Sequence, residues 1–341
     1  MESGLYLLII IVILALLFDY INGFHDAANA IATVVSTKAL SPRSAVIYGA
    51  VLNFCGALLG TEVAATIGKG LVHAEAVTLA VIIYALTGAI LWNLLTWYFG
   101  LPSSSSHALI GSLLGATFFS SSEGAEAIRG WHLIEWHAVW YKVVIPMFTS
   151  PVLGLMLGFT IMGTLMWMMH KTHLYWINRI FSKLQLVSSG FLAVSHGHND
   201  AQKSMGIIAL ALMICYSTPE SAFSVPLWVK IACATMMGLG TLTGGWRIIR
   251  TLSTKMIRFQ PVYGFAAEAT SAAIIMGASH IGIPLSTTQV ISSSIMGVAT
   301  TKRLSAVKWN VVTNILWAWV LTIPVTFLFS GMLTAIFSQL F

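Results

Sequence analysis

Gly23-Phe24-His25-Asp26-Ala27-Ala28-Asn29 and Gly197-His198-Asn199-Asp200-Ala201-Gln202-Lys203 are two versions of one short motif. Each version places a carboxylate inside an otherwise apolar segment. A charged side chain at the centre of a membrane helix costs about 2.5–3.5 kcal/mol on insertion scales, so such residues are rare and mark functional sites. The repetition predicts a polar site to which both halves of the chain contribute.

The composition indicates an integral membrane protein. Of the 341 residues, 57% are hydrophobic and 8% are charged, whereas a soluble domain carries about 25% charged residues. At roughly 20 apolar residues per spanning helix, the chain has room for about ten crossings or half-crossings. We therefore predict an all-α, polytopic helical bundle in the lipid bilayer.

The net charge of +6 is explained by membrane orientation better than by nucleic-acid binding. Basic residues cluster at 38–43, 171–183, 247–258 and 302–308, whereas the acidic residues favour other loops: Glu2, Glu75, Glu123, Glu126, Glu135 and Glu220. By the positive-inside rule the basic connectors face the cytoplasm, and both termini lie outside. We expect a multi-pass protein of the plasma (inner) membrane with no nucleic-acid partner.

The first motif is expected to kink or interrupt its helix, and the second motif is expected to interrupt its helix. The segment from Leu5 to Val35 meets polar residues and a glycine at 19–23, and the segment from Leu186 to Cys215 meets them at 196–203. Lipid tolerates a broken helix only where the break faces protein or a cavity. Further spans are predicted at 45–66, 77–99, 143–169, 227–246, 262–281 and 311–328.

Two short apolar helices follow matching Gly-x-Pro turns, and we expect them to form re-entrant hairpins. Gly100-Leu101-Pro102 precedes a hydroxyl-rich run at 103–106, and Gly282-Ile283-Pro284 precedes another at 286–288. Pro suits the first turn of a helix, where free N–H groups and the positive end of the dipole favour an anion. Two such ends near the midplane predict a site for a tetrahedral oxyanion. The alternative is that the small residues only allow close helix packing.

The motif and the hairpin recur in the same order, which divides the chain into two repeats, residues 1–170 and 171–341. The first motif helix starts outside, whereas the second starts from a basic, cytoplasmic connector. The repeats are therefore inverted, an arrangement common in secondary transporters, whose sites lie at the repeat interface near the midplane.

Carboxylates repel an anion in a low dielectric, so a cation must lie between them and the anion. It is either sodium, held by Asp, Asn and backbone carbonyl oxygens freed by the breaks, or a proton, since burial disfavours the ionised carboxylate. Lys203 either pairs with Asp200 or contacts the anion. For Glu268, a coupling role and a helix-to-helix hydrogen bond are both open. A metal centre at His196 and His198 is disfavoured, because residues i and i+2 of a helix do not share a face.

At these motifs the chain resembles the inorganic phosphate transporter (PiT) family over nearly its whole length. Residues 22–29 and 196–206 are similar to its two signature motifs, and 102–106 and 284–288 are similar to its hairpin motifs. The resemblance implies a transporter, not an enzyme, that carries phosphate with sodium or protons and needs no other cofactor. The candidate phosphate-binding residues are Ser104, Ser105, Ser106, Asn29, Ser286, Thr287, Thr288 and Lys203. The candidate cation-binding residues are Asp26, Asp200, Asn199 and Glu268, of which Asp26 and Asp200 are the metal ligands if the cation is sodium.

The sequence departs from the family pattern at three positions. His25 stands where the family often has Asn, Lys203 replaces the second Asn of the later motif, and Asn53 stands where many eukaryotic relatives carry Glu. The large central loop of eukaryotic members is absent, so the chain resembles compact prokaryotic members, which are proton-linked as often as sodium-linked.

Three alternatives remain open from the sequence. A sulfate permease or a metal–phosphate permease would share the architecture. An intramembrane hydrolase would use Ser, His and Asp in nucleophilic catalysis, although the sequence has no Gly-x-Ser-x-Gly elbow and its polar groups repeat symmetrically. The sequence leaves the oligomeric state open and is compatible with a homodimer.

Overall fold

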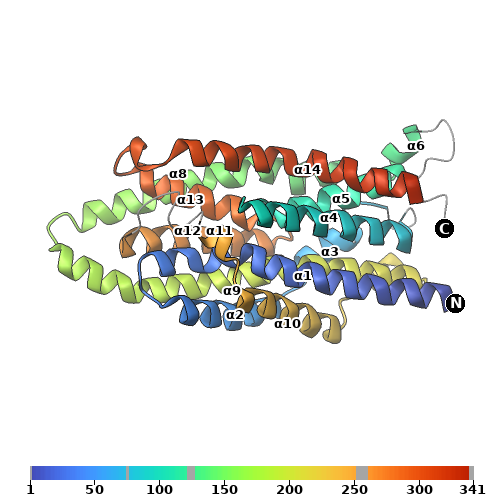
Figure 1. The fold of residues 1–341 in the computed structure, drawn as a ribbon, viewed down its shortest axis with the longest axis horizontal. Helices are drawn as coiled ribbons and strands as arrows, with labels where there is room; N and C mark the ends of the chain where they lie inside the picture. Colours follow the sequence, from blue (N-terminus) through green and yellow to red (C-terminus); the bar gives the residue numbers. More distant parts are fainter. Residues whose placement is uncertain (1, 74–76, 121–126, 251–259, 338–341) are drawn as a thin grey trace.

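The computed structural model describes residues 2–73, 77–120, 127–250 and 260–337, and these are built almost entirely from helices (Figure 1). Glu75, Glu123, Glu126, Lys255 and Arg258, which contribute to the charge pattern, lie outside the described residues. The first half contains α1 (Glu2–Ser36), α2 (Pro42–Ala57), α3 (Glu62–Lys69), α4 (Leu79–Phe99), α5 (Ser105–Phe119), α6 (Ala127–His132), α7 (Trp136–Val139), a π-helical turn (Trp140–Val144) and α8 (Ile145–Met168). The second half contains α9 (Leu174–Cys215), α10 (Leu227–Thr243), α11 (Trp246–Arg250), α12 (Pro261–His280), α13 (Thr287–Thr300) and α14 (Trp309–Phe337).

Several of the described helices are long and apolar enough to cross a membrane. Four meet this test: α1, α4, α14 and the continuous stretch Trp136–Met168 that ends with α8. The pair α2 and α3 passes only when taken together, with a bend of 68° between them. The segment predicted as one span at 45–66 is therefore two helices with a turn at 58–61, and α3 packs against α9.

The helices that carry the two motifs are not interrupted. α1 is helical from residue 2 to 36 and α9 from 174 to 215, so the predicted breaks and the freed carbonyl oxygens are wrong. Some of their polar side chains bond to neighbouring helices. Asp19, for example, accepts a hydrogen bond of 2.6 Å from Ser204 on α9.

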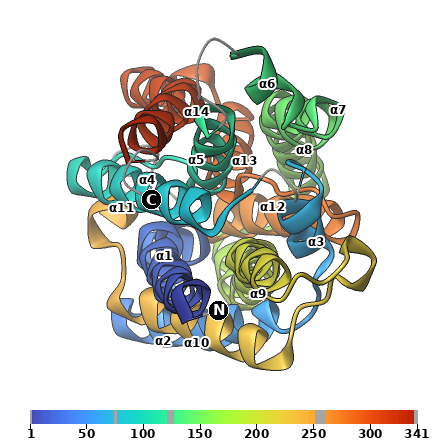
Figure 2. The same ribbon diagram turned by 90° about the vertical axis from the view of Figure 1, so that its right-hand side faces the viewer.

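Helices of one repeat pack against helices of the other repeat, with close contacts between their backbones. α1 packs on α10, and α9 packs on α2. A Cβ added at Gly240 of α10 would lie 2.1 Å from the carbonyl oxygen of Tyr20, and one at Gly56 of α2 would lie 2.1 Å from that of Val194. α5 packs on α14 and α13 on α8 in the same reciprocal way. Figure 2 shows α1 and α9 side by side, with α2 and α10 beyond them on one side.

Two helical hairpins enter the bundle from opposite ends. In Figure 1, α4 and α5 lie toward the end that carries both termini, whereas α12 and α13 lie toward the end with the connectors α1–α2, α8–α9 and α13–α14. Gly100 and Gly282, at the matching turns, have φ of 65° and 69°, which only glycine adopts without strain. The turns meet, since Ser106 Oγ donates to the carbonyl oxygen of Leu285 at 2.9 Å. This is an all-α membrane bundle of two inverted repeats with re-entrant hairpins, as the sequence predicted.

We predict that Gly56→Val destabilises the fold by about 1–3 kcal/mol, the usual cost of overpacking. The added side chain would meet the backbone of α9 at Val194, which cannot move aside as a side-chain tip can. Thermal unfolding in detergent measures the effect. Gly163→Val is the matched control, because a Cβ at Gly163 would meet no atom within 4 Å. Equal unfolding temperatures for the two variants would contradict this packing argument.

Candidate functional site

Two buried carboxylates meet where α1 and α9 lie side by side. Asp26 is 3% exposed and Asp200 is not exposed. One oxygen of each and a ring nitrogen of His196 all lie within 4.8 Å of one another. Charges this close in a low dielectric repel strongly unless something positive compensates them. The two motif carboxylates are therefore close enough to need positive charge or hydrogen-bond donors around them.

The N-terminal turns of both hairpin helices face these carboxylates. Ser105 on α5 donates to Asp26 Oδ2 at 3.2 Å, and Thr288 on α13 donates to Asp26 Oδ1 at 3.3 Å. Thr287 donates to Asp200 Oδ2 at 3.2 Å. Hydroxyls from two opposite hairpins thus converge on one place inside the bundle.

Ser104 and Ser286 precede these hydroxyls and act as N-caps. Ser104 Oγ accepts from the N–H of His107 at 3.2 Å, and Ser286 Oγ accepts from the N–H of Gln289 at 3.3 Å. A side-chain oxygen at this position satisfies one of the otherwise unpaired N–H groups of the first turn. Their predicted contact with phosphate stays a prediction, whereas their role in fixing the start of each helix is visible.

Asn29 and Lys203, at equivalent motif positions, each reach the opposite repeat's hairpin. Asn29 Nδ2 donates to Thr288 Oγ1 at 2.9 Å. Lys203 is fully buried, and its ammonium group donates to Ser106 Oγ and lies 2.5 Å from Asp200 Oδ1. Of the two roles that the sequence left open for Lys203, pairing with Asp200 is the one seen in the structure.

Asn199 and Glu268, the other two predicted cation ligands, do not share the hydroxyl contacts of Asp26 and Asp200. Asn199 is buried, and neither polar atom of its side chain bonds to a residue that the structure describes. Glu268 on α12 belongs to a second polar cluster, where Oε1 accepts from Thr33 at 2.5 Å and from Gln185 at 3.0 Å and Oε2 accepts from Ser188. These bonds tie α12 to α1 and α9, so the helix-to-helix role of Glu268 is present, and its coupling role remains a prediction.

Sequence reasoning missed two histidines that belong to the site. His25 Nδ1 lies 2.7 Å from Asp26 Oδ1, and His196 Nε2 lies 3.2 Å from Asp200 Oδ2. Spacing could have revealed the second pair, because residues i and i+4 share a helix face. His198, considered with His196 in the sequence, instead contacts Gln202 at 3.2 Å. Among the described residues, the side chains close enough to hold a metal ion together are Asp26, His196 and Asp200, without His198.

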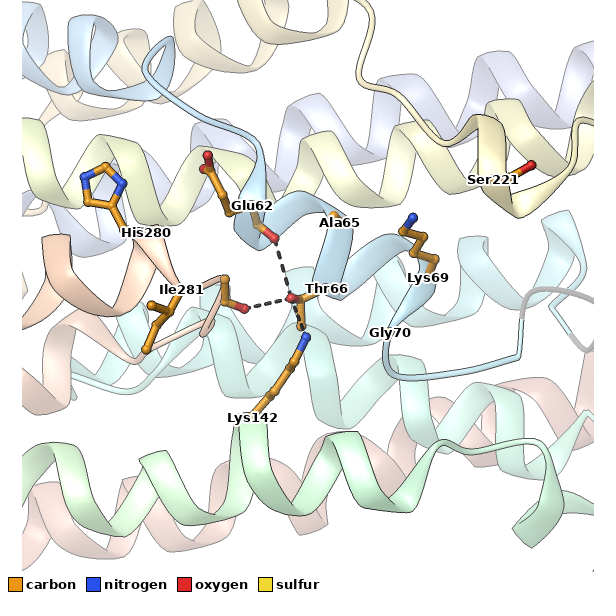
Figure 3. Close-up of a pocket in the computed structure, with 10 residues that line it drawn as sticks. Glu62, Ala65, Thr66, Lys69, Gly70, Lys142, Ser221, His280 and Ile281 are labelled. Carbon is orange, nitrogen blue, oxygen red and sulfur yellow. Dashed lines mark hydrogen bonds between the residues drawn. The ribbon is translucent and has the colours of Figure 1, made fainter.

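A pocket of about 680 Å³ opens beside α3, next to the turn of the α12–α13 hairpin (Figure 3). Its lining includes three basic side chains, Lys69, Lys142 and His280, together with Glu62. Lys142 Nζ donates to Thr66 Oγ1 at 3.1 Å, and Thr66 Oγ1 donates to the carbonyl oxygen of Gly282 at 2.7 Å. These bonds hold the hairpin turn against α3, four residues before Ser286.

Inverted repeats with opposed re-entrant hairpins over buried carboxylates define a membrane transport protein of the inverted-repeat class. The Phosphate transporter family profile matches residues 22–330, and the chain belongs to that family. This is a family of membrane transport proteins, so the hydrolase alternative is wrong.

Curated relatives and one solved structure resemble the chain over nearly its whole length. A "Probable low-affinity inorganic phosphate transporter" of Bacillus subtilis (strain 168) is 46% identical over 330 residues, 96% of each chain. A protein of the same description from Rhizobium meliloti (strain 1021) is 42% identical, over 96% of this chain and 95% of that one. A solved structure described as "The sodium-dependent phosphate transporter" has a TM-score of 0.85 and 23% identity, and the match covers 98% of this chain and 100% of that chain. The last match confirms the fold.

We predict that Thr288→Val lowers the free energy of unfolding by about 1–3 kcal/mol, because it removes one buried hydrogen bond to Asp26 Oδ1 and another from Asn29 Nδ2. Thermal unfolding in detergent measures this loss, and Thr288→Ser, which keeps the hydroxyl, should restore most of it. Thr235→Val is a matched control, since the Thr235 hydroxyl is exposed and bonds only within its own helix. Similar losses in Thr235→Val and Thr288→Val would contradict the inferred role of Thr288.

Proposed function

We propose that the protein is a secondary active transporter that imports inorganic phosphate together with a cation, either sodium or a proton. The observation that carries this proposal is the meeting of two hydroxyl-bearing helix N-termini with two buried carboxylates at the interface of the inverted repeats. The helix ends and hydroxyls attract an oxyanion, and the carboxylates attract a cation. Neither the oxyanion nor the cation binds favourably alone in a low dielectric, so the binding of one is coupled to the binding of the other.

In this proposal the anion contacts both hairpins and both motif helices. Its ligands are Ser104, Ser105, Ser106, Ser286, Thr287, Thr288, Asn29 and Lys203. Protonated phosphate can donate hydrogen bonds to carboxylates, whereas sulfate cannot, which favours phosphate over sulfate at this site. The descriptions of the relatives support the same substrate.

The cation is assigned to Asp26 and Asp200, with Asn199 and Glu268 as further ligands. Asp26 and Asp200 provide hard carboxylate oxygens, which suit sodium, and their burial also suits a proton. The similar solved structure is that of a sodium-dependent transporter, which supports sodium.

The proposal also covers how the chain lies in the plasma (inner) membrane. Both termini lie at one end of the bundle, and the connectors α1–α2, α8–α9 and α13–α14, which carry basic residues, lie at the other (Figure 1). The positive-inside rule then puts the termini outside. The reciprocal helix contacts support a division into repeats at 1–170 and 171–341. The proposal extends to a homodimer, which the mass of the detergent-solubilised protein tests.

Reconstituted protein should accumulate labelled phosphate when a sodium or a proton gradient is imposed on the liposomes. The two gradients are varied independently, so that the driving ion is identified. Unlabelled phosphate should compete strongly and sulfate weakly. Folded protein that takes up no phosphate under either gradient would overturn the proposal.

We predict that Asp26→Asn and Asp200→Asn each reduce gradient-driven uptake by more than about tenfold, the order of a typical coupling free energy between two ligands. Each change removes a charge that attracts the cation while preserving the shape of the side chain. Asp19→Asn is the matched control, because Asp19 is equally buried but bonds to Ser204 outside the carboxylate pair. Full gradient dependence in either site variant would show that its carboxylate has no role in coupling.

A further inference from the structure

The pocket beside α3 lies at the end of the bundle that carries both termini. Figure 2 views the bundle from that end and shows α3 in front of α12. Ser221, which also lines the pocket, belongs to the connector that follows α9. Because Asp26 and Asp200 are buried, a solute that approaches from this end meets the pocket before it meets the carboxylate pair.

We propose that this pocket is an oxyanion-capture site, at which Lys69 and Lys142 bind inorganic phosphate before it enters the buried site. The inference rests on the proposed function and deepens it, because it adds a first binding site on the route of the same substrate. The ligand class is a small tetrahedral oxyanion.

The two lysines of the pocket lie beside one face of α3. Lys142 Nζ donates to Thr66 Oγ1 at 3.1 Å (Figure 3). Lys69 is in the last turn of α3 and follows Thr66 by three residues, and residues i and i+3 are neighbours on a helix surface. Both ammonium groups are therefore available to an anion held against this face.

The charges of these ammonium groups are not compensated. Among the described residues, neither Lys69 nor Lys142 lies within 4.0 Å of a carboxylate oxygen. Lys69 Nζ lies 5.6 Å from the centre of the Phe223 ring, and Phe223 and the Thr66 hydroxyl are both neutral partners. Glu62 is the one carboxylate among the described residues of the lining. An ammonium group has three donors, so donors remain for charge-assisted bonds to an oxyanion.

The lining suits a dissolved ion better than a lipid chain. Four of its ten residues are ionisable: Glu62, Lys69, Lys142 and His280. Charged side chains are costly against hydrocarbon, so a hollow with this lining is hydrated. Its volume of about 680 Å³ lies within the range of small-molecule sites, roughly 300–1,000 Å³. The pocket therefore has room for phosphate together with water.

The pocket shares structural elements with the buried site. Gly282 lines the pocket, and Ser286, four residues later, caps the hairpin helix whose hydroxyls face the carboxylate pair. Four extended residues span at most about 14 Å. On the other wall, Gln202, the neighbour of Lys203, accepts from the N–H of Val63 in the first turn of α3 at 2.7 Å. The pocket is thus built on the same hairpin and motif as the site.

A contact between α3 and the hairpin turn separates the pocket from the buried site. Thr66 Oγ1 donates to the carbonyl oxygen of Gly282 at 2.7 Å. Ser286 and Thr287 are 2% and 1% exposed, so the site hydroxyls are closed off in this structure. Lys142 donates to the same Thr66 hydroxyl. An anion bound by Lys142 therefore lies next to the contact that opens when the anion passes inward.

Phosphate protection of a cysteine in the pocket tests the inference. Full-length Ser221→Cys protein in phosphatidylcholine nanodiscs is treated with a sulfonate-bearing methanethiosulfonate, and mass spectrometry follows modification at position 221. At a phosphate concentration ten times its Kd, modification should slow by about tenfold, because the pocket is free only about a tenth of the time. His132→Cys is the control, since His132 is exposed at the same end and does not line the pocket. Its modification should not respond to phosphate.

Charge variants of the Ser221→Cys protein show whether the ammonium groups hold the anion. Lys69→Gln should raise the half-protecting phosphate concentration by about tenfold, the loss of one charge-assisted bond. Lys69→Arg should leave that concentration close to its original value. Within the described part of the chain Lys69 makes no hydrogen bond or ion pair, so Lys69→Gln leaves the fold intact. Lys69→Gln with Lys142→Gln should abolish the protection.

Three results would overturn the inference. They are modification at position 221 that phosphate does not slow, protection that persists in Lys69→Gln with Lys142→Gln, and protection by phosphatidylglycerol to which inorganic phosphate adds nothing. The last result would make the pocket a lipid-headgroup site. Failure of the proposed function is distinguishable, because it appears as absent uptake in liposomes while protection at position 221 is unchanged. The pocket would then bind phosphate without passing it inward, and the inference would fall with the proposed function.

Discussion

The structure depends on the repulsion between two buried carboxylates. Asp26 and Asp200 come from helices that lie side by side, and each carries an oxygen within 4.8 Å of the other's. Such a pair is unfavourable in a membrane unless positive charge and hydrogen-bond donors surround it. The bundle supplies Lys203, two histidines, and the hydroxyls and helix ends of two hairpins. The donors that stabilise the carboxylate pair also attract an oxyanion. The need to compensate two buried carboxylates therefore accounts for both the arrangement of the helices around them and the properties of the site.

Because the repeats are inverted, the same pair of sequence motifs, one on a long helix and one at a hairpin, forms both halves of the site. Each motif helix packs on a helix of the other repeat, and each hairpin brings its hydroxyls into the interior of the bundle from its own end. A re-entrant hairpin can start a helix inside the bilayer. The free N–H groups of that first turn interact strongly with an anion there, because water is excluded and the dielectric is low. Uninterrupted α1 and α9 provide the rigid support against which these helix ends are held.

The sequence predicted the membrane class, the inverted repeats, the hairpins and the convergence of the two hydroxyl-bearing helix ends, because each depends on composition or on a repeated motif. It failed where tertiary contacts decide the outcome. Polar residues in α1 and α9 suggested broken helices, but both helices are continuous, and Asp19 of α1 bonds to Ser204 of the neighbouring α9. The bend between α2 and α3 contains Gly60 but lacks the Gly-x-Pro pattern that marks the turns at Gly100 and Gly282. The cluster around Glu268 joins three helices and could not be assembled from spacing within one segment.

The central claim is that cation and anion each make the other's binding favourable at this site. Equilibrium binding of phosphate to detergent-solubilised protein, measured across independent series of sodium concentration and pH, tests that claim most directly. The account predicts that phosphate affinity rises by roughly 5–150-fold with one of these cations, and that phosphate tightens binding of that cation by the same factor, as linkage requires. Phosphate affinity that is the same at every sodium concentration and every pH would contradict it.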